Sequence, residues 1–384
     1  MSDETGASEY RSGREGWWAA LLPGLPYLLR RRWIAGFGIL AMAAFLAAVL
    51  VLGRERVFAT LGGGGGDIDD WVAFATLTLG LGSLWGLSFA ALRSGPGGDR
   101  SAAWSQWSTA AREFTKNRLA VVGLGALVVL TAVTLLAPYL APYDPVHIGD
   151  VVGTRNLRPS LDHLMGTDKL GRDVFSRVLY GARISLAIGF TAIAIAITLG
   201  TAVGAAAGYF GGVVDAILMR IVDVLIAFPR LVLLIVVVSL LGHSVNIVII
   251  VLGLTLWPST ARIVRGEVLS LREREFIQAA RALGFGDRRI IARHVIPNVM
   301  APVIVGATLG IGNVILIESG LSFLGLGVPI DVPTWGRILD DGRAALLSTW
   351  WVTTFPGLAI VYTVVAINLI GDGLRDALDP RLRM

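Results

Sequence analysis

The side chains that could carry out chemistry in this chain are few and widely separated. Cysteine is absent, which excludes thiol catalysis, disulfides and cysteine-ligated metals. The histidines include no pair at the i, i+4 spacing with which a helix holds a metal ion. The sequence also lacks a Gly-x-Ser-x-Gly elbow and a Gly-Lys-Ser/Thr phosphate loop. We therefore expect no catalytic residue, no metal ion and no nucleotide on this chain itself.

Two acidic residues fall inside long apolar segments. Asp223 lies within 217–241, close enough to Arg220 to pair with it, and Glu318 lies well inside 300–324. A carboxylate at membrane depth is costly and usually faces a protein interior or a cavity. Both residues are therefore candidates for a translocation path. For Glu318, hydrogen bonding to neighbouring helices is the structural alternative.

The most highly charged run of the chain, residues 271–298, lies between two apolar segments. It reads LREREFIQAARALGFGDRRIIARHVIPN and contains six arginines. Such a run does not belong in a bilayer. Basic residues concentrate in cytoplasmic loops, so we interpret it as a cytoplasmic elbow between two membrane spans.

The spacing inside this run predicts a helix–turn–helix. The first helix would carry a small, smooth patch formed by Ala279, Ala280, Ala282 and Leu283. Gly284 would end this helix as a C-cap. Asp287 would N-cap the second helix, and Pro297 would break it just before the next span. A basic loop that only obeyed the charge-asymmetry rule would explain the arginines but not these spacings.

Composition and hydropathy patterning set these residues in an all-α polytopic membrane protein. The chain of 384 residues is 54% hydrophobic and only 16% charged, against about 25% charged in soluble domains. Its apolar residues form long runs, each about the length of one bilayer crossing. The eight predicted spans are about 33–53, 71–92, 119–139, 182–208, 217–241, 245–263, 300–324 and 350–373.

The side of the membrane follows from the basic residues. They cluster at 30–32, 93–118, 262–293 and 375–383, all on one side of the predicted arrangement, which places both termini in the cytoplasm. The net charge of +5 reflects these loops and does not indicate nucleic-acid binding. The first apolar run lies too deep in the chain and is too long for a cleaved signal peptide, so we favour an uncleaved span.

The predicted organisation has six parts. They are a cytoplasmic N-terminus 1–32, a transmembrane hairpin 33–92, a cytoplasmic linker 93–118, a first core span with an outer loop 119–181, a core 182–373 that contains the elbow 265–298, and a cytoplasmic tail 374–384.

The outer loop within 140–181 has balanced charges, with five basic and five acidic residues. Its glycines suggest tight turns. One interpretation is a hydrogen-bonded loop that caps the following helix, and the other is a docking surface for a molecule outside the cell; both can hold. The candidate residues are Gly166, Thr167, Asp168, Gly171, Arg172 and Asp173.

The elbow resembles the cytoplasmic signature of binding-protein-dependent ABC transporter permeases, E-A-A, three residues, Gly, nine residues, Ile, one residue, Leu, Pro. The matching residues are Ala279, Ala280, Gly284 and Pro297, and the departures are Gln278, His294 and Ile296. The run HLMGTDKLGRDVFSRVLYGARISL, residues 163–186, is similar to the C-type permease subunits of the dipeptide, oligopeptide and nickel branch, as is ESGLSFLGLGV further on.

The resemblance covers about residues 105–384 and implies a type I ABC importer (MetI-like) transmembrane fold of six spans, here with an extra N-terminal two-helix hairpin. It implies a pore-forming permease that imports peptides by alternating access, in the cytoplasmic membrane of a prokaryote. Nickel or another small solute is the alternative cargo, and a secondary transporter is the alternative mechanism.

The resemblance also implies partners. These are a second permease subunit forming a heterodimer, one or two ATPase subunits that bind ATP and Mg, an extracytoplasmic substrate-binding protein and membrane lipid, with no nucleic acid. The residues it assigns to ATPase coupling are Glu275, Gln278, Ala279, Ala280, Arg281, Gly284, Asp287, Arg288 and Pro297.

Overall fold

The computed structural model describes residues 106–148 and 150–378, and this part of the chain is helical apart from its loops and one isolated β-bridge between Thr167 and Asp173. The chain divides into two compact units, Met1–Trp104 and Ser105–Met384. The predicted N-terminus 1–32, the hairpin 33–92 and the end of the tail lie outside the described residues.

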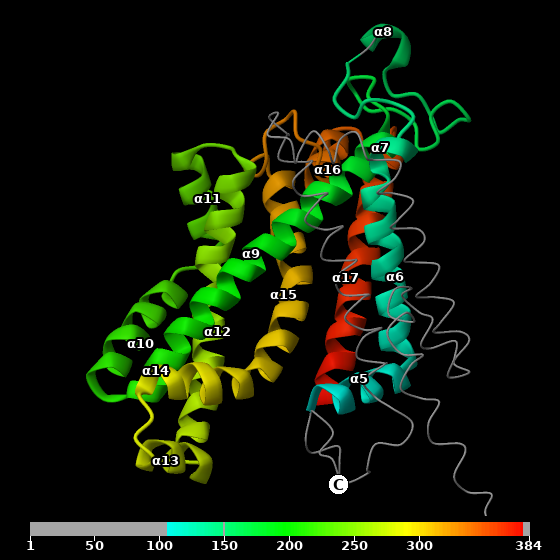
Figure 1. Cartoon of the computed structure of the whole chain (residues 1–384). Helices are drawn as coiled ribbons and strands as arrows, with labels where there is room; N and C mark the ends of the chain where they lie inside the picture. Colours follow the sequence, from blue (N-terminus) through cyan, green and yellow to red (C-terminus); the bar gives the residue numbers. More distant parts are fainter. Residues whose placement is uncertain (1–105, 149, 379–384) are drawn as a thin grey trace, which may run out of the picture. The chain divides into compact units, whose positions relative to one another are not determined.

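The helices follow one another without a sheet between them in the described part (Figure 1). Their bounds are α5 Gln106–Lys116, α6 Arg118–Leu135, α7 Ala137–Leu140, α8 Val151–Thr154, α9 Val174–Phe210, α10 Gly212–Ala227, α11 Arg230–Leu241, α12 Val245–Arg272, α13 Glu275–Ala282, α14 Asp287–Ile290, the π-helix Ile291–Val295, α15 Ile296–Phe323, α16 Trp335–Arg343 and α17 Trp350–Leu378.

Five helical stretches in the described residues are long and apolar enough to cross a membrane. The stretches are Arg118–Leu135, Val174–Phe210, Val245–Arg272, Asp287–Phe323 and Trp350–Leu378. A sixth arises if the bent pair α10 and α11 counts as one span. Each corresponds to one of the six core spans predicted from the sequence, whereas the first two of the eight predicted spans lie outside the described residues.

The predicted span 217–241 is bent by 85° between α10 and α11. The break falls at Phe228 and Pro229. Phe228 has an extended backbone, with φ −80° and ψ 133°, as expected for a residue that precedes a proline. Pro229 has no N–H to continue the helix, so α11 begins anew at Arg230.

Two spans, α9 and α12, pack with their backbones unusually close. Gly200, Gly204 and Gly208 recur every four residues on one face of α9. A Cβ on Gly204 would lie 2.5 Å from the carbonyl oxygen of Ala261, and one on Gly208 would lie 2.8 Å from the Cβ of Val268. Small residues permit this approach between helices in a membrane. The contact makes α9 and α12 a closely fitted pair.

Pro297 does not break the helix, contrary to the sequence prediction. The stretch Asp287–Phe323 runs on through it as one helical stretch. The five residues Ile291–Val295 before it are a π-helix, in which the N–H of Ile296 donates to the carbonyl of Ile291. A π-turn widens the helix by one residue, which accommodates a residue that can neither donate nor fit against the preceding turn.

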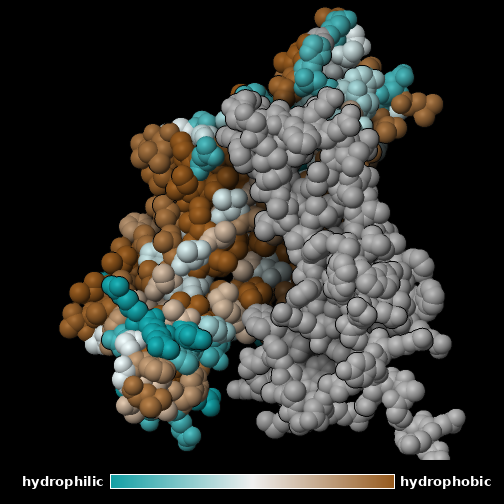
Figure 2. Space-filling model, in the orientation of Figure 1, coloured by the Kyte–Doolittle hydropathy of each residue, from teal (hydrophilic) through white to brown (hydrophobic). Residues whose placement is uncertain are grey.

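The two ends of the described unit are formed by different helices. The elbow helices α13 and α14 lie at the same end as α5, and α7, α8 and α16 lie at the opposite end (Figure 1). Figure 2 shows hydrophilic side chains gathered over the elbow and hydrophobic side chains along α10 and α11. This is the distribution expected when the flanks of the bundle face lipid and its ends face water.

Candidate functional site

The turn of the elbow is formed by a Schellman motif at Gly284. The N–H of Phe285 donates to the carbonyl of Ala280 at 3.1 Å, and the N–H of Gly284 donates to that of Arg281 at 2.9 Å. Gly284 has φ +77°, a left-handed conformation that glycine adopts without steric strain because it has no Cβ. Gly284 therefore lies at the end of the first elbow helix as predicted, but the C-cap itself is Leu283 and Gly284 is the residue after it.

The inner face of the elbow packs against its own chain. Ile277, Ala280 and Ile290 are buried in one cluster with Val268 of α12 and Val295 of the π-helix. Ala280 is only 5% exposed. The sequence prediction placed Ala280 with Ala279 on a patch for a partner, but the structure turns Ala280 inward, because position 280 follows Ile277 by three residues and shares its face of the helix.

The outer face of the elbow is exposed and partly apolar. Ala279 lies on it, together with Phe276, 44% exposed, and Leu283, 74% exposed. Positions 276, 279 and 283 have the i, i+3, i+7 spacing of one helix face. We call these three residues the elbow face. The sequence prediction included Leu283 in its patch but omitted Phe276, although the spacing of Phe276 to Ala279 was visible in the sequence.

The remaining coupling candidates, Glu275, Gln278, Arg281, Gly284, Asp287 and Arg288, are all exposed. The side-chain amide nitrogen of Gln278 donates to the carbonyl of Glu273 at 3.2 Å. Gln278, which replaces the Glu of the signature, is therefore hydrogen-bonded to its own chain.

Asp287 does not act as the predicted N-cap. The N-cap position of α14 is Gly286, and Asp287 is the first helical residue. Its carboxylate instead accepts a hydrogen bond from the hydroxyl of Tyr209, at 2.8 Å. The guanidinium of Arg281 lies over the same tyrosine ring, 4.8 Å from its centroid. Both elbow helices therefore meet one side chain of α9.

At the opposite end, buried charges join the outer loop to α9 and α16. Arg172 donates to Asp168 at 2.7 Å and to Asp341 at 2.8 Å, and Arg177 donates to the same two carboxylates. These four side chains are at most 3% exposed. Lys169 adds a contact of 3.2 Å to Asp341. We call these five residues the outer charge cluster.

The outer charge cluster lowers the pKa of Asp341. Burial alone would raise the pKa, but the positive charges of Arg177 and Arg172 outweigh burial and hold it below its ordinary value of 3.8. The sequence analysis counted the balanced charges of the outer loop within 140–181 but did not pair them with partners. The equal numbers of acidic and basic residues were the signal that ion pairs would form. The acceptor Asp341 lies more than 160 residues after Arg172 and Arg177 in the chain.

The loop candidates are held in place by backbone and side-chain contacts. Trp351 of α17 donates from its indole N–H to the carbonyl of Thr167 at 3.1 Å. A Cβ on Gly166 would lie 2.7 Å from the same indole nitrogen, and one on Gly171 would lie 2.2 Å from the hydroxyl of Thr154. Asp173 N-caps α9 by accepting from the N–H of Ser176. These contacts match the interpretation of a hydrogen-bonded, helix-capping loop.

The tip of this loop is different from its base. Val152 and Leu161 are 95% and 96% exposed, whereas Thr167, Asp168, Arg172 and Asp173 are buried. A partner that approached from this side would meet the tip and not these four side chains. The docking interpretation of the candidates stays a prediction.

The two carboxylates that the sequence predicts at membrane depth have different surroundings. Glu318 is fully buried in α15, where one oxygen accepts from the hydroxyl of Ser322 at 2.8 Å and the other has no hydrogen-bond partner in the described part of the chain. Asp223 pairs with Arg262 of α12 at 2.6 Å, not with Arg220 as predicted, and both side chains are half exposed. This ion pair joins α10, which carries Asp223, to α12, which carries Arg262.

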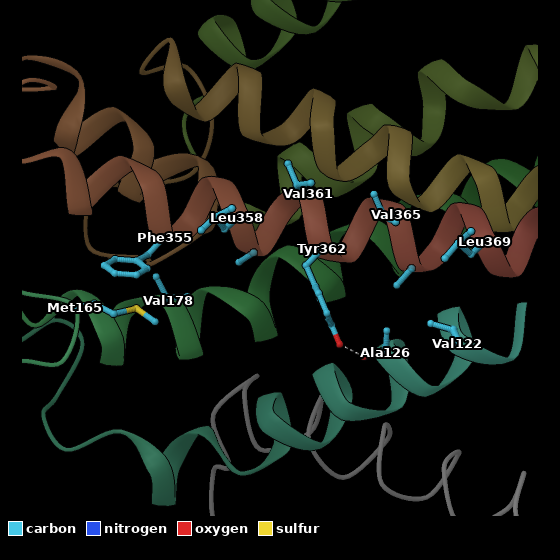
Figure 3. Close-up of a pocket in the computed structure, with 12 residues that line it drawn as sticks. Val122, Ala126, Met165, Val178, Phe355, Leu358, Val361, Tyr362, Val365 and Leu369 are labelled. Atoms are coloured by element: carbon cyan, nitrogen blue, oxygen red, sulfur yellow. Dashed lines mark hydrogen bonds between the residues drawn. The ribbon is translucent and has the colours of Figure 1, made fainter. Parts of the chain in front are cut away.

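An apolar groove runs between α6 and α17 (Figure 3). Its volume is about 660 Å³, and Tyr362 is the single polar side chain in its lining. The Tyr362 hydroxyl donates to the carbonyl of Ala126 at 3.1 Å. The lining has no charged group that could bind a charged solute. In the described residues no group of three or more His, Cys, Asp or Glu side chains could hold a metal ion.

Comparison with known proteins gives two family matches. Residues 196–384 match the family described as binding-protein-dependent transport system inner membrane component, and residues 105–159 match the N-terminal TM domain of oligopeptide transport permease C. Both matches fall within the unit Ser105–Met384.

Relatives of known description are similar over most of their length. A dipeptide transport system permease protein, DppC of Alkalihalophilus pseudofirmus, is 43% identical over 290 residues, which are 76% of this chain and 95% of that one. A glutathione transport system permease protein, GsiD of Shigella dysenteriae, is 43% identical over 72% of this chain and 91% of its own. A solved inward-facing MetNI methionine ABC transporter is 19% identical, with a TM-score of 0.43, over 53% of this chain and 96% of that chain.

Proposed function

The chain belongs to the family of binding-protein-dependent transport system inner membrane components, and on that basis we propose that it is the pore-forming permease subunit of an ATP-driven peptide importer. It would move its cargo across a bacterial inner membrane by alternating access. Support comes from the five helical stretches of the described unit that are long and apolar enough to cross a membrane, with a sixth if α10 and α11 count as one span.

Peptides are the cargo that the relatives favour. The similar proteins are described as permeases for dipeptides, peptides and glutathione, which is itself a small peptide. None of these descriptions supports nickel, the alternative that the sequence left open. Family membership likewise favours an ATP-driven importer over a secondary transporter.

The observation that carries the proposal is the elbow face. The elbow face is exposed at the elbow end of the bundle and consists of Phe276, Ala279 and Leu283. The opposite side of the same short helix is buried in the core. An exposed apolar patch on a rigid support is a feature of protein interaction sites. We assign it to docking with an ATPase subunit, which would bind the ATP and Mg and carry out the hydrolysis.

The remaining partners follow from this assignment. The elbow end and both termini would lie in the cytoplasm, and the outer charge cluster on the other side. There an extracytoplasmic binding protein would deliver the peptide, and the tip of the outer loop would meet it. A second permease subunit would complete the pore, and the exposed apolar side chains of α10 and α11 would face lipid or that subunit.

Leu283→Asp tests the proposal. We expect the variant to insert normally, because Leu283 is 74% exposed and no packing is lost. A charge at the centre of a docking patch should abolish both co-purification of the ATPase subunit and uptake of radiolabelled dialanine, because hot-spot substitutions typically cost about 2 kcal/mol or more of binding free energy.

The matched control is Leu347→Asp. Leu347 is fully exposed and lies between α16 and α17, at the other end of the unit. This variant should keep ATPase co-purification. Normal co-purification and uptake by Leu283→Asp would contradict the docking assignment.

A further inference from the structure

The elbow is joined to its neighbouring spans by two joints that can deform. Before it, Glu273 and Arg274 form a two-residue turn between α12 and α13. After it, the π-helix Ile291–Val295 leads into α15, and a π-segment interrupts the α-helical hydrogen-bond pattern with i→i+5 bonds. A tilt of the elbow could therefore be taken up at these joints without moving the spans.

A third connection bypasses both joints. Tyr209 stands in the last turn of α9, is 4% exposed, and packs in the same cluster as Ile277 and Ile290 of the elbow. Its hydroxyl donates to the carboxylate of Asp287 in α14, and its ring lies under the guanidinium of Arg281 in α13. One side chain thus contacts the two elbow helices on either side of the Gly284 turn.

These contacts are of a kind that resists displacement. A hydrogen bond to a charged group is stronger than one between neutral groups, and the Tyr209 ring that carries the hydroxyl is buried. The cation over the ring face adds a further attraction. A movement of either elbow helix is therefore passed to Tyr209 through Arg281 or Asp287.

The span that carries Tyr209 is well placed to transmit such movement. The glycine face of α9 fits α12 closely along the elbow half of both helices. At its other end, α9 carries Arg177, which binds Asp168 and Asp341 in the outer charge cluster. With 37 residues, α9 extends from the elbow to this cluster.

We propose that Tyr209 is the positioning residue that fixes the elbow to the α9–α12 pair, so that a force on the elbow moves these spans and not only its joints. The inference rests on the proposed function, because it needs an ATPase that pulls on the elbow. It adds a residue outside the elbow signature, on a span more than 60 residues earlier in the chain.

The test compares transport with ATP hydrolysis in the reconstituted complete complex. Tyr209→Phe removes only the hydroxyl and keeps the buried ring. We expect ATPase co-purification and hydrolysis to remain, and dialanine transported per ATP hydrolysed to fall about tenfold, the size of effect that a charged hydrogen bond produces. A role in folding or assembly would instead lower co-purification and leave this ratio unchanged.

Tyr362→Phe is the matched control, because it removes another tyrosine hydroxyl that joins two helices, at 3.1 Å from Ala126, away from the elbow. Its transport ratio should equal that of the wild type. In a second comparison, Tyr209→Phe combined with Asp287→Ala should be no worse than Asp287→Ala alone, because the hydroxyl acts through that carboxylate.

The outcomes separate the inference from the proposed function. A wild-type complex that hydrolyses ATP and imports dialanine, with an unchanged ratio in Tyr209→Phe, overturns the inference alone. Equal losses in Tyr209→Phe and Tyr362→Phe also overturn it, because any helix-joining hydroxyl would then do the same. A wild type without ATP-dependent import overturns the proposed function and the inference with it.

Discussion

At the scale of single residues, the buried arginines of the outer charge cluster are matched by an equal number of buried aspartates. Arg172 and Arg177 are both buried, and each binds Asp168 and Asp341. Removing one member of such a set leaves an uncompensated charge, which costs more than the pair contributes. This is why the cluster can fix the loop to α16 only while all its members stay ionised.

This dependence gives a prediction for pH. Because the folded-state pKa of Asp341 is lowered, its contribution to the free energy of unfolding is fully present above the ordinary carboxyl pKa and is lost as pH falls through the lower, folded-state pKa. The thermal midpoint of the purified protein should drop in that acid range. Asp341→Asn should lower the free energy of unfolding by about 3 kcal/mol at neutral pH. Its thermal midpoint should also fall less steeply than that of the wild type as the pH is lowered.

The control for this experiment is Asp331→Asn. Asp331 is exposed, in the loop before α16, so its variant should follow the wild-type curve at every pH. An Asp341→Asn variant with wild-type stability at neutral pH would show that the cluster does not hold the outer end together.

At the scale of elements, the close fit of α9 to α12 depends on glycine. Gly204→Leu would place side-chain atoms where the Ala261 carbonyl lies, 2.5 Å from the added Cβ. Overpacking costs about 1–3 kcal/mol or more, and here the backbone has to move. We expect a lower thermal midpoint in detergent and loss of dialanine uptake.

Gly306→Ala is the comparison for that variant. Gly306 lies inside α15, and an added Cβ would meet nothing within 4 Å. Alanine favours a helix over glycine by about 1 kcal/mol, so this change should leave stability the same or slightly higher. If both variants behaved alike, close helix packing would not explain the glycines of α9.

The helices were largely predictable from the sequence, and the exceptions have local causes. Long apolar runs fixed the six core spans, and Gly284 fixed the turn of the elbow. Pro297 was wrongly expected to end a helix, because single-residue propensity does not show that a π-turn can absorb a proline. Ala280 was placed on the wrong face, because two adjacent alanines cannot share one face of a helix.

At the scale of the whole molecule, the two compact units coincide with a boundary in the comparisons. The second unit begins at Ser105, where the first family match also begins. Contacts within this unit hold its first helices: Asn117 N-caps α6 and donates to Asp376 of α17 at 3.3 Å, and a Cβ on Gly373 would lie 3.2 Å from the Phe114 ring.

We therefore predict that a chain starting near residue 101 inserts, co-purifies with the ATPase subunit and imports dialanine at a rate within about twofold of the full chain, because its core contacts are unchanged. Uptake normalised to the amount of inserted protein measures this. A truncated chain that inserts normally but imports nothing would show that the first unit takes part in transport.

The sequence by itself determined the solvent of each segment, and from it the class of protein. Long apolar runs and clustered arginines were enough to predict a helical membrane protein with a cytoplasmic elbow, because the bilayer imposes its thickness and its charge preference on local sequence. The permease prediction came from the resemblance of the elbow and the outer loop to a known family. Only the tertiary structure decided which charges pair, that Tyr209 meets both elbow helices, and that Ala280 faces inward while Phe276 and Leu283 face out. These facts depend on residues far apart in the chain approaching to hydrogen-bond distance, and no local pattern encodes that approach.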